Sequence, residues 1–324
     1  MKTILIMGGA GYIGSHTVKH LIEQGYTCVV ADNLSSGHRE AVHPQAVFEK
    51  ADLLDPASLE AVFAKYHFEA VLHFAAFASV GESVQDPQKY YHNNVVGTWN
   101  LLHTMLAHGV KKIVFSSTCA TYGEPQYTPM DEKHPQHPIN PYGRTKLIVE
   151  QMFGDYAQAY GLKYIALRYF NAAGCAADGS IGESHDPETH LIPLVLHTIM
   201  GKRPCIKIFG TDYPTPDGTC LRDYIHVEDL AVAHRLALEK LDSYSGYINL
   251  GTGIKTSVKE IIAAAEAVTG KKCPVELAAR RAGDPAILYA ANGQAAQILG
   301  WTPKYLHVQD ILATAWKWEE HRKY

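Results

Sequence analysis

The chain has 324 residues, and at roughly 150 residues per typical domain this length predicts about two domains. Hydrophobic residues make up 47% and charged residues 19%, a balance that supports a large buried core and excludes an intrinsically disordered chain or a small disulfide scaffold. The 29 basic and 33 acidic residues give a net charge of −4, and no stretch is dense in Lys or Arg, so we expect no nucleic-acid partner.

Short apolar runs alternate with amphipathic segments along the first 170 residues. Most of these runs are continuously apolar, which is typical of strands buried on both faces of a parallel sheet. The expected strands are 3–7, 27–31, 47–50, 70–74, 112–116 and 164–169, and the expected helices between them are 13–24, 56–66, 87–107 and 142–160. Asp86-Pro87 predicts a helix start, and Gly109 and Gly161 predict helix ends. The alternation predicts an α/β fold with a doubly wound parallel (Rossmann) sheet.

The character of the sequence changes after Asn171. Residues 171–190 are rich in Gly, Ala, Asp and His without periodicity, and helices are expected to resume at 228–240, 258–269, 294–299 and 308–321. We expect one domain over residues 1–170 and a second, smaller, loop-rich α/β domain over residues 171–324. The apolar run 247–250 is expected to return to the first sheet.

Cysteine usage and hydropathy indicate the compartment. The six cysteines include no C-x-x-C pair and are typical of reduced thiols, so we expect neither disulfides nor a metal site: Cys28, Cys119, Cys175, Cys205, Cys220 and Cys273. No apolar run approaches the roughly 18 residues of a membrane span, and the apolar stretch that precedes Gly8 is too short for a signal peptide. We expect a cytoplasmic protein without a membrane partner.

A glycine loop, Gly8-x-x-Gly11-x-x-Gly14, directly follows the first expected strand and opens the first expected helix. Glycine is needed where the chain turns tightly, where the backbone approaches a pyrophosphate, and where the helix packs on the strand. The start of the helix then offers free N–H groups and a positive dipole end to phosphates. In this strand–loop–helix context the pattern favours a dinucleotide site over an ordinary tight turn.

Asp32 ends the second expected strand. An acidic side chain there accepts hydrogen bonds from ribose hydroxyls and repels a 2′-phosphate, which favours NAD over NADP. The alternative is that Asp32-Asn33 only caps a βα turn. Asp52-Leu53, after the third strand, is a candidate for the adenine contact.

Tyr142 and Lys146 form a Y-x-x-x-K pair at the start of a helix, after the strand that ends near Thr118. Residues four apart share a helix face, so the lysine ammonium is expected beside the tyrosine phenol. A nearby cation lowers the tyrosine pKa from its ordinary value near 10 and makes the phenol a usable general base. Thr118 is expected to bond the same substrate oxygen. The alternative is a surface pair without a catalytic role, which the glycine loop disfavours.

These residues also indicate a family. The glycine loop, Asp32, Tyr142 and Lys146 resemble the extended short-chain dehydrogenases/reductases, as do the segments 74–76, 93–94, 116–118 and 168–171. Further segments resemble the members of that family that epimerise UDP-hexoses at C4: 80–83, 209–215, 217–219, 222–227 and 280–284. The likeness covers essentially the whole chain.

The resemblance implies an NAD-dependent epimerase that interconverts UDP-galactose and UDP-glucose in galactose metabolism. Hydride would pass from sugar C4 to NAD⁺ and back through a 4-keto sugar, with Tyr142 taking the proton of the 4-hydroxyl and Lys146 tuning Tyr142 and holding the nicotinamide ribose. The cofactor-binding residues that it implies are Gly8, Gly11, Tyr12, Ile13, Gly14, Asp32, Asn33, Asp52, Leu53, Phe74, Ala75, Ala76, Asn94, Tyr142, Lys146 and Phe170. The implied substrate-binding residues are Thr118, Asn171, His190, Leu191, Lys207, Phe209, Arg222, Arg281 and Asp284.

The resemblance further implies a homodimer formed through the helices near 87–107 and 142–160. Two arginines suit a diphosphate, because guanidinium groups bind phosphate oxygens in pairs, whereas an isolated arginine more often forms a surface ion pair. Three positions depart from the family. Ala78 stands where some members carry a lysine near the cofactor, which leaves cofactor retention open. His190 replaces a common asparagine, and Leu288 occupies a position often held by tyrosine; these two leave the 2-substituent of the sugar, hydroxyl or N-acetyl, open.

Two other functions compete with the epimerase. A nucleotide-sugar 4,6-dehydratase, or a decarboxylase of the same superfamily, is the nearest enzyme. Dehydratases place an Asp-Glu pair after the catalytic threonine, but Thr118 is followed by Cys119-Ala120. A non-catalytic NAD sensor would not need Tyr142, Lys146 and Thr118 together, so their presence argues against it.

Overall fold

The centre of the molecule is a seven-stranded sheet in which every pair of neighbouring strands is parallel. The computed structural model describes residues 2–281 and 284–324. In spatial order the strands are β11 (Gly246–Leu250), β6 (Lys163–Tyr169), β5 (Lys112–Thr118), β4 (Ala70–His73), β1 (Thr3–Met7), β2 (Thr27–Asp32) and β3 (Val47–Lys50). The predicted doubly wound α/β fold is confirmed, and the run 247–250 lies in the first sheet beside β6.

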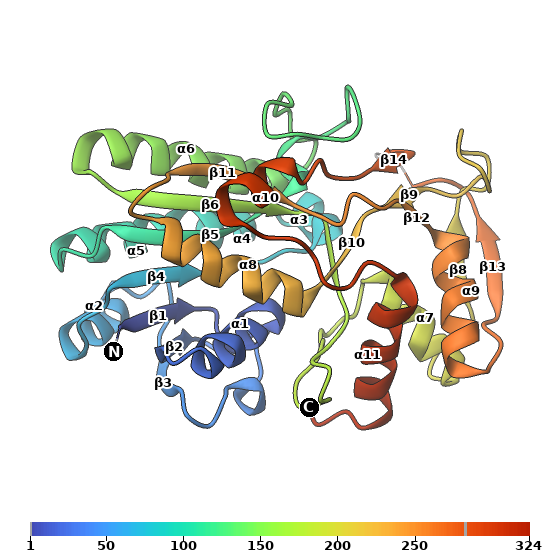
Figure 1. The fold of residues 1–324 in the computed structure, drawn as a ribbon, viewed down its shortest axis with the longest axis horizontal. Coiled ribbons are helices and arrows are strands. Elements are labelled where there is room, and N and C mark those ends of the chain that lie inside the picture. The colour runs from blue at the N-terminus through green and yellow to red at the C-terminus, as the bar shows by residue number, and fades with distance from the viewer. Residues whose placement is uncertain (1, 282–283) are drawn as a thin grey trace.

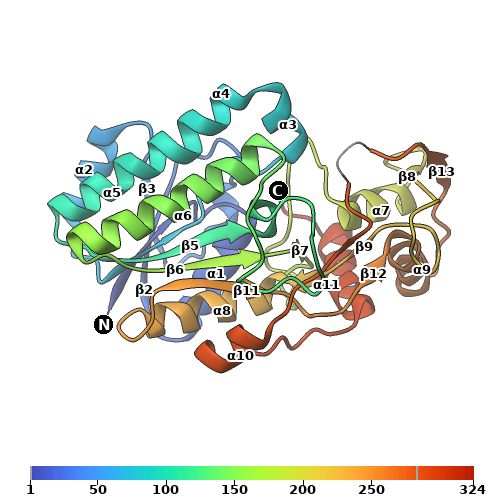
Figure 2. The ribbon, with the colours of Figure 1, turned by 90° about the horizontal axis from the view of Figure 1, so that it is seen from above.

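Helices cover both faces of this sheet (Figures 1 and 2). The helices of one face are α1 (Tyr12–Glu23) and α8 (Val227–Lys240); those of the other are α2 (Pro56–Lys65), α5 (Gly97–Ala107) and α6 (Pro141–Tyr160). Strand β1 shows why the sequence requires two layers: Ile4 and Ile6 pack in the core with α1 and α8, and Leu5 and Met7 pack in the core on the opposite face.

The expected helix boundaries are largely met. Asp86 accepts a hydrogen bond from the Lys89 N–H at 3.1 Å, and Gly161 ends α6 with a φ of 71°. The expected helix 87–107 contains an interruption that periodicity did not reveal: α4 (Pro87–Tyr90) continues through a π-helical segment, η2 (Tyr91–Val96), into α5. Such segments often occur at functional sites.

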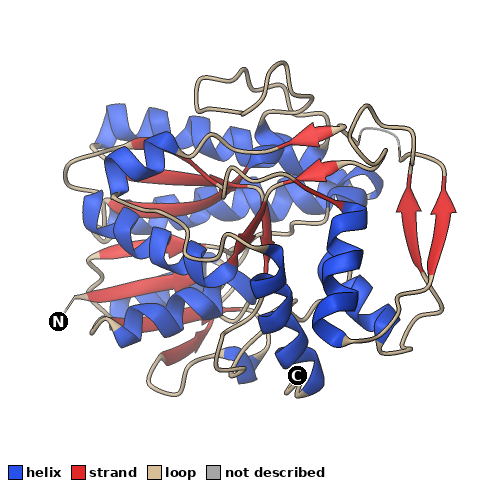
Figure 3. Cartoon of the chain, turned by 45° about the vertical axis from the view of Figure 1, so that its right-hand side comes forward, coloured by secondary structure: helices blue, strands red, loops and turns tan. Residues whose placement is uncertain are grey.

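A second lobe lies to the right of the sheet in Figure 1. Three helices pack around an apolar core of their own: α7 (Leu191–Ile199), α9 (Val258–Thr269) and α11 (Val308–Glu320). The parallel strands β8 (Ile206–Phe209) and β13 (Val275–Ala278) form the outer edge of this lobe (Figure 3). Helix α10 (Gly293–Leu299) returns to the first sheet and packs near β11.

Several short elements were not expected from the sequence. They are α3 (Val80–Gln85), η1 (Arg39–Ala41), η3 (Cys119–Thr121), and the strands β7 (Asn171–Ala173), β9 (Leu221–Arg222), β10 (Tyr224–His226), β12 (Thr256–Ser257) and β14 (Ile287–Leu288). Elements of two to six residues are too short to show a period, and pairings such as β12–β9–β14 join residues far apart in the chain. Helix α7 was also not predicted from the sequence, because it is apolar on nearly all sides and so shows no amphipathic pattern.

Every helix within residues 2–281 and 284–324 is too short or too polar to cross a bilayer.

Candidate active site

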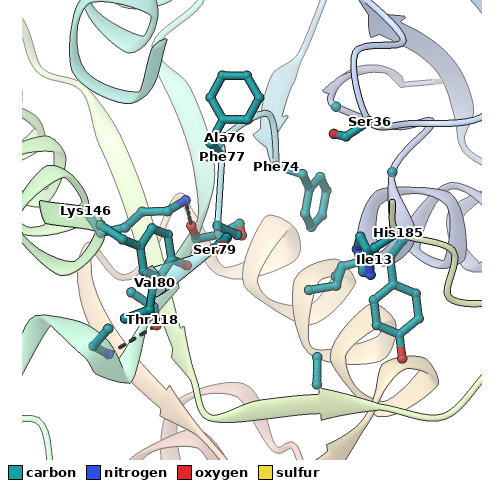
Figure 4. Close-up of a pocket in the computed structure, with 18 of the residues that line it drawn as sticks. Ile13, Ser36, Phe74, Ala76, Phe77, Ser79, Val80, Thr118, Lys146 and His185 are labelled. Carbon is teal, nitrogen blue, oxygen red and sulfur yellow. Dashed lines mark hydrogen bonds between the residues drawn. The ribbon is translucent and has the colours of Figure 1, made fainter. Parts of the chain in front are cut away.

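The loops at the carboxyl ends of the parallel strands enclose a cleft of about 800 Å³. This volume lies within the usual range of small-molecule sites, and the position is the one where open α/β sheets bind ligands. Figure 4 shows Lys146 and Thr118 on one side of the cleft and Ile13 and His185 on the opposite side, with Phe74 between them. The cleft therefore lies between the end of the sheet and the loops that lead into the second lobe.

The glycine loop is shaped by contacts that exclude side chains. Gly8 has a φ of 81°, and a Cβ on it would lie 2.5 Å from the Ala75 backbone nitrogen. A Cβ on Gly14 would lie 2.3 Å from the Gly8 carbonyl oxygen. Gly11 precedes α1 and no side chain caps this helix, which leaves backbone N–H groups at the cleft. These N–H groups and the positive end of α1 fit a pyrophosphate.

Asp32 at the end of β2 is 8% exposed and lines the cleft. Its carboxylate accepts hydrogen bonds from the N–H groups of Ala10 at 3.0 Å and Leu34 at 2.8 Å. Burial raises the pKa of Asp32, although these two bonds act in the opposite direction. Because each oxygen accepts only one of these bonds, each retains a lone pair for a ribose hydroxyl. Turn formation and ribose binding are therefore compatible at this one carboxylate.

Helix α6 places Tyr142 and Lys146 along one wall of the cleft. Asn140 begins the helix by accepting a hydrogen bond from the Gly143 N–H at 2.8 Å. Lys146 Nζ lies 5.9 Å from the centroid of the Tyr142 ring and donates a hydrogen bond to the Ser116 carbonyl at 2.7 Å. The expected i, i+4 pair is therefore present, with the ammonium anchored on β5.

Burial dominates the acidity of both groups. It lowers the pKa of Lys146 to about 7, although Glu150 acts to raise it. It raises the pKa of Tyr142 to about 12, with a hydrogen bond to Thr118 acting in the opposite direction. This differs from our expectation that the lysine lowers the tyrosine pKa. The reason is that the Lys146 ammonium bonds the Ser116 carbonyl, while the phenol loses its contact with water.

Thr118, the last residue of β5, is 7% exposed and lines the cleft beside Tyr142. Its hydroxyl oxygen accepts a hydrogen bond from the Ala120 N–H at 3.1 Å, so its one hydroxyl hydrogen points to the cleft side, where Tyr142 Oη and a ligand oxygen are the alternative acceptors. Burial raises the pKa of the next residue, Cys119, to about 12, so its thiol is neutral. Neither Cys119 nor Ala120 can act as the acid–base pair of a dehydratase.

Two arginines converge on Asp284 at the far end of the cleft. Arg222, on β9, donates to the Pro285 carbonyl at 2.8 Å and to Asp284 Oδ1 at 3.2 Å. Arg281 pairs with Asp284 Oδ2 at 3.0 Å and lies over the Phe209 ring, 4.8 Å from its centroid. Two guanidinium groups and one carboxylate leave a net positive charge, which fits a diphosphate. Residues 282 and 283 of the expected 280–284 segment lie outside the described residues.

Most of the expected site residues line this one cleft. They are Gly8, Gly11, Tyr12, Ile13, Gly14, Asp32, Asn33, Asp52, Leu53, Phe74, Ala75, Ala76, Thr118, Tyr142, Lys146, Phe170, Asn171, His190, Arg222, Arg281 and Asp284. The two departures from the family, Ala78 and Leu288, line it too.

Four expected residues do not line the cleft. Asn94 is buried behind its wall, where its amide group exchanges two hydrogen bonds, each 3.0 Å long, with the backbone of Phe77. Leu191 packs on the core of the second lobe. Lys207 pairs with Glu276 across β8 and β13 at 3.2 Å, and the Phe209 ring lies under the guanidinium group of Arg281, which does line the cleft. The Asn94 side chain thus holds the backbone of Phe77, which lines the cleft.

Other lining residues were not expected. Ser79, Val80 and Val84 come from α3 and the residue before it, and Gly37 comes from the loop after β2. The similarity of 80–83 to the family was the available signal for α3, although it assigned no role. No sequence motif indicated Gly37 as a site residue, although a Cβ at this position would lie 2.8 Å from the Ala10 backbone.

Glu183, His185, Glu188 and His190 cluster at the rim of the cleft, all four within the described residues. Burial lowers the pKa of both histidines, but the two carboxylates outweigh it and raise the pKa to about 9 for His185 and to about 10 for His190. The cluster was not predicted, although the E-x-H-x-x-E-x-H spacing of these residues is a sequence signal for it.

Comparison with known proteins identifies the family of this chain. Residues 4–251 match the model of the NAD dependent epimerase/dehydratase family. The chain belongs to this family. It is 54% identical over 321 residues to a UDP-glucose 4-epimerase of Halalkalibacterium halodurans, an alignment that covers 98% of this chain and 96% of the relative.

Solved structures agree with this family. The structure of a UDP-glucose 4-epimerase from Brucella ovis in complex with NAD superposes with a TM-score of 0.95 at 53% identity, covering 98% of each chain. A UDP-glucose 4-epimerase from Bifidobacterium longum in complex with NAD⁺ and UDP superposes with a TM-score of 0.93 at 36% identity, covering 99% of each chain.

Proposed function

We propose that this chain is an epimerase that interconverts UDP-galactose and UDP-glucose with NAD as its resident cofactor. The observation that supports it best is one shared cleft. Tyr142 and Lys146 lie there between the glycine loop at one end and the Arg222–Asp284 pair at the other. The names of the relatives, UDP-glucose 4-epimerases aligned over nearly the whole chain, support the same substrate pair.

The two ends of the cleft suit the two ligands. Residues 1–170 are proposed to bind NAD: the α1 N–H groups bond its pyrophosphate and Asp32 accepts from the adenosine ribose. Residues 171–324 are proposed to bind the UDP-sugar, with Arg222 and Arg281 on its diphosphate. Bound NAD supplies the hydride acceptor and donor for sugar C4.

The residues between the two ends handle the proton. In its phenolate form, which the positive charges of Lys146 and of bound NAD⁺ would favour against the effect of burial, Tyr142 accepts the proton of the 4-hydroxyl at Oη and returns it when the ketone is reduced. Thr118 donates its hydroxyl hydrogen to the same sugar oxygen and so positions it. Lys146 stays charged while Tyr142 is a phenolate, because the phenolate compensates for the burial of the ammonium. The arginines hold the diphosphate while the hexose turns about its phosphate linkage and presents its other face.

Turnover without added cofactor tests this proposal. The purified protein should convert UDP-galactose to UDP-glucose with no NAD supplied and no accumulation of NADH absorbance. Tritium placed at C4 should stay on the sugar, because an internal hydride never exchanges with water. Stoichiometric NADH release would indicate a dehydrogenase instead, tritium in the solvent would indicate deprotonation chemistry, and binding without turnover would indicate a sensor.

We also propose that the chain forms a homodimer through α5 and α6, which lie side by side on the outer face in Figure 2. Trp99 on α5 and Tyr160 on α6 are each about half exposed, at 50% and 51%, and large aromatic side chains are enriched in interfaces. Light scattering after gel filtration should give the mass of two chains, and Trp99→Glu should shift it toward one. A monomeric parent would contradict the proposal.

We further propose a cytoplasmic location. All six cysteines are free thiols in the structure, as a reducing compartment favours. Fractionation of the producing cells should recover the activity with the cytoplasmic fraction.

A further inference from the structure

The segment 183–190 joins the loop after β7 to the start of α7 and forms part of the cleft rim. Figure 4 shows His185 beside Ile13, across the cleft from Lys146. Each of Glu183, His185, Glu188 and His190 offers one ligand atom, and these four atoms lie within 4.8 Å of one another. None of them belongs to the proton-transfer group of Tyr142.

The distances between these atoms are those of ligands around a common centre. His185 Nδ1 lies 3.4 Å from Glu183 Oε1 and 3.5 Å from Glu188 Oε2. His190 Nδ1 lies 2.7 Å from Glu183 Oε1 and 3.4 Å from Glu188 Oε1. Four ligands at about 2.1 Å from a tetrahedral zinc ion are about 3.4 Å apart. The two distances from His185 Nδ1 match this value, whereas the 2.7 Å between His190 Nδ1 and Glu183 Oε1 is shorter.

A second observation concerns the hydrogen-bond geometry of Glu183 and His185. Glu183 is 4% exposed, and its Oε1 is a buried oxygen without a hydrogen-bond partner, although two imidazole nitrogens lie within 3.4 Å of it. The buried His185 Nδ1 has no hydrogen-bond partner either. In a simple ion pair the N–H group of the imidazolium points at the carboxylate oxygen. His185 Nδ1 and Glu183 Oε1 thus approach to 3.4 Å without an aligned hydrogen bond between them, which leaves both atoms able to bind one ion.

We propose that Glu183, His185, Glu188 and His190 bind a zinc ion at the rim of the cleft. Two imidazole nitrogens and two carboxylate oxygens are a donor set that Zn²⁺ accepts in tetrahedral geometry. The two carboxylates balance the charge of the ion, and each imidazole binds through Nδ1 in its neutral form.

The surrounding hydrogen bonds hold the ligands in place. Glu188 Oε1 accepts from the N–H groups of Thr189 at 2.7 Å and His190 at 2.8 Å, which leaves Oε2 to the ion. The Trp318 indole donates to the Glu183 carbonyl at 3.0 Å and fixes that residue against α11. Outer-shell bonds of this kind orient ligands and increase metal affinity.

Zinc binding to the full chain tests this site directly. The EDTA-treated, desalted protein is titrated with ZnCl₂ in competition with a chromogenic zinc chelator, and separately with CoCl₂ while the visible spectrum is recorded. Glu183→Gln and His190→Asn each remove one ligand, and Glu124→Gln and His67→Asn are matched controls at exposed positions. His190 is half exposed, at 51%, so its variant is expected to fold even if the buried Glu183 variant does not.

The expected result is one zinc per chain, with affinity at least about tenfold lower in either ligand variant and unchanged in both controls. Cobalt should give the visible bands of a four-coordinate ion and no thiolate charge-transfer band, which separates this site from the six free cysteines. Absence of zinc binding in the parent, equal affinity in all five proteins, or a thiolate band would each overturn the proposal.

Discussion

Replacement of Lys146 by Met should make the protein more stable while it abolishes most turnover. Lys146 is 3% exposed, and burial lowers its pKa from 10.5 to about 7. The unfolded chain therefore binds one more proton between these two values, so the free energy of unfolding of the parent rises with pH across this window. The destabilisation is fully present below pH 7 and disappears near pH 10.5.

The magnitude follows from the pKa change. At 1.36 kcal/mol per unit, the buried lysine lowers the free energy of unfolding by about 4–5 kcal/mol at pH 6 and by about 2 kcal/mol at pH 9. Met fills nearly the same volume without a charge, but it leaves the Ser116 carbonyl without its 2.7 Å partner, a loss of about 1–3 kcal/mol. We expect Lys146→Met to be more stable than the parent by roughly 2 kcal/mol at pH 6, and this difference to vanish by pH 9.

Urea unfolding of cofactor-free protein between pH 6 and pH 9 measures this difference. Lys133→Met is the matched control, because Lys133 is exposed and its substitution should change stability little at any pH. A Lys146→Met variant that is less stable than the parent at pH 6, or a difference independent of pH, would refute the reasoning. The same variant should lose turnover, because Met supplies no positive charge beside the Tyr142 phenolate.

Three further predictions concern single residues. Tyr142→Phe removes only the hydroxyl and should lower turnover of UDP-galactose by about 10²–10⁴-fold. The amount of bound NAD, measured by its absorbance after acid release, should be unchanged, and a rate within threefold of the parent would contradict a general-base role. Asp32→Ala should lower NAD occupancy after gel filtration, because charge-assisted bonds to the ribose are worth about 1.5–3 kcal/mol each; full occupancy would leave Asp32 only its turn bonds. Glu150→Gln breaks the buried ion pair with Arg168, in which an Arg168 nitrogen lies 2.6 Å from the carboxylate, and should lower the free energy of unfolding by about 3–5 kcal/mol. An unchanged urea midpoint would show that this pair does not stabilise the fold.

The first lobe could be predicted from the sequence because its elements are long and locally encoded. The run Ile4–Met7 must lie between two apolar layers, and the spacing of Gly8, Gly11 and Gly14 has few structural solutions. Tyr142 and Lys146 were placed together because four residues are one turn of a helix. Each of these inferences depends on neighbours within about 20 residues.

The second lobe could not be predicted to the same depth, because distant residues determine it. Strand β9 exists only because Thr256 and Leu288 come to pair with Arg222. The resemblance assigned Lys207 to the substrate, but its β8 position turns it toward Glu276 on the outer edge. The acidity of Tyr142 was mispredicted for a related reason: its distance to Lys146 was foreseen, but the depth of burial around both was not.

The two ends of the cleft differ in how firmly they can hold a ligand. The proposed NAD end is built from backbone N–H groups of the tightly packed loop that contains Gly8 and Gly14, and from the nearly buried Asp32 at the end of β2. At the other end the side chain of Arg281 is 62% exposed and pairs with Asp284 through long, solvent-accessible atoms that rearrange at little cost. A cofactor that is regenerated in place must remain through every turnover, whereas the UDP-sugar must exchange in every turnover. The rigid backbone end and the exposed side-chain end therefore lie where the proposed reaction requires retention and exchange.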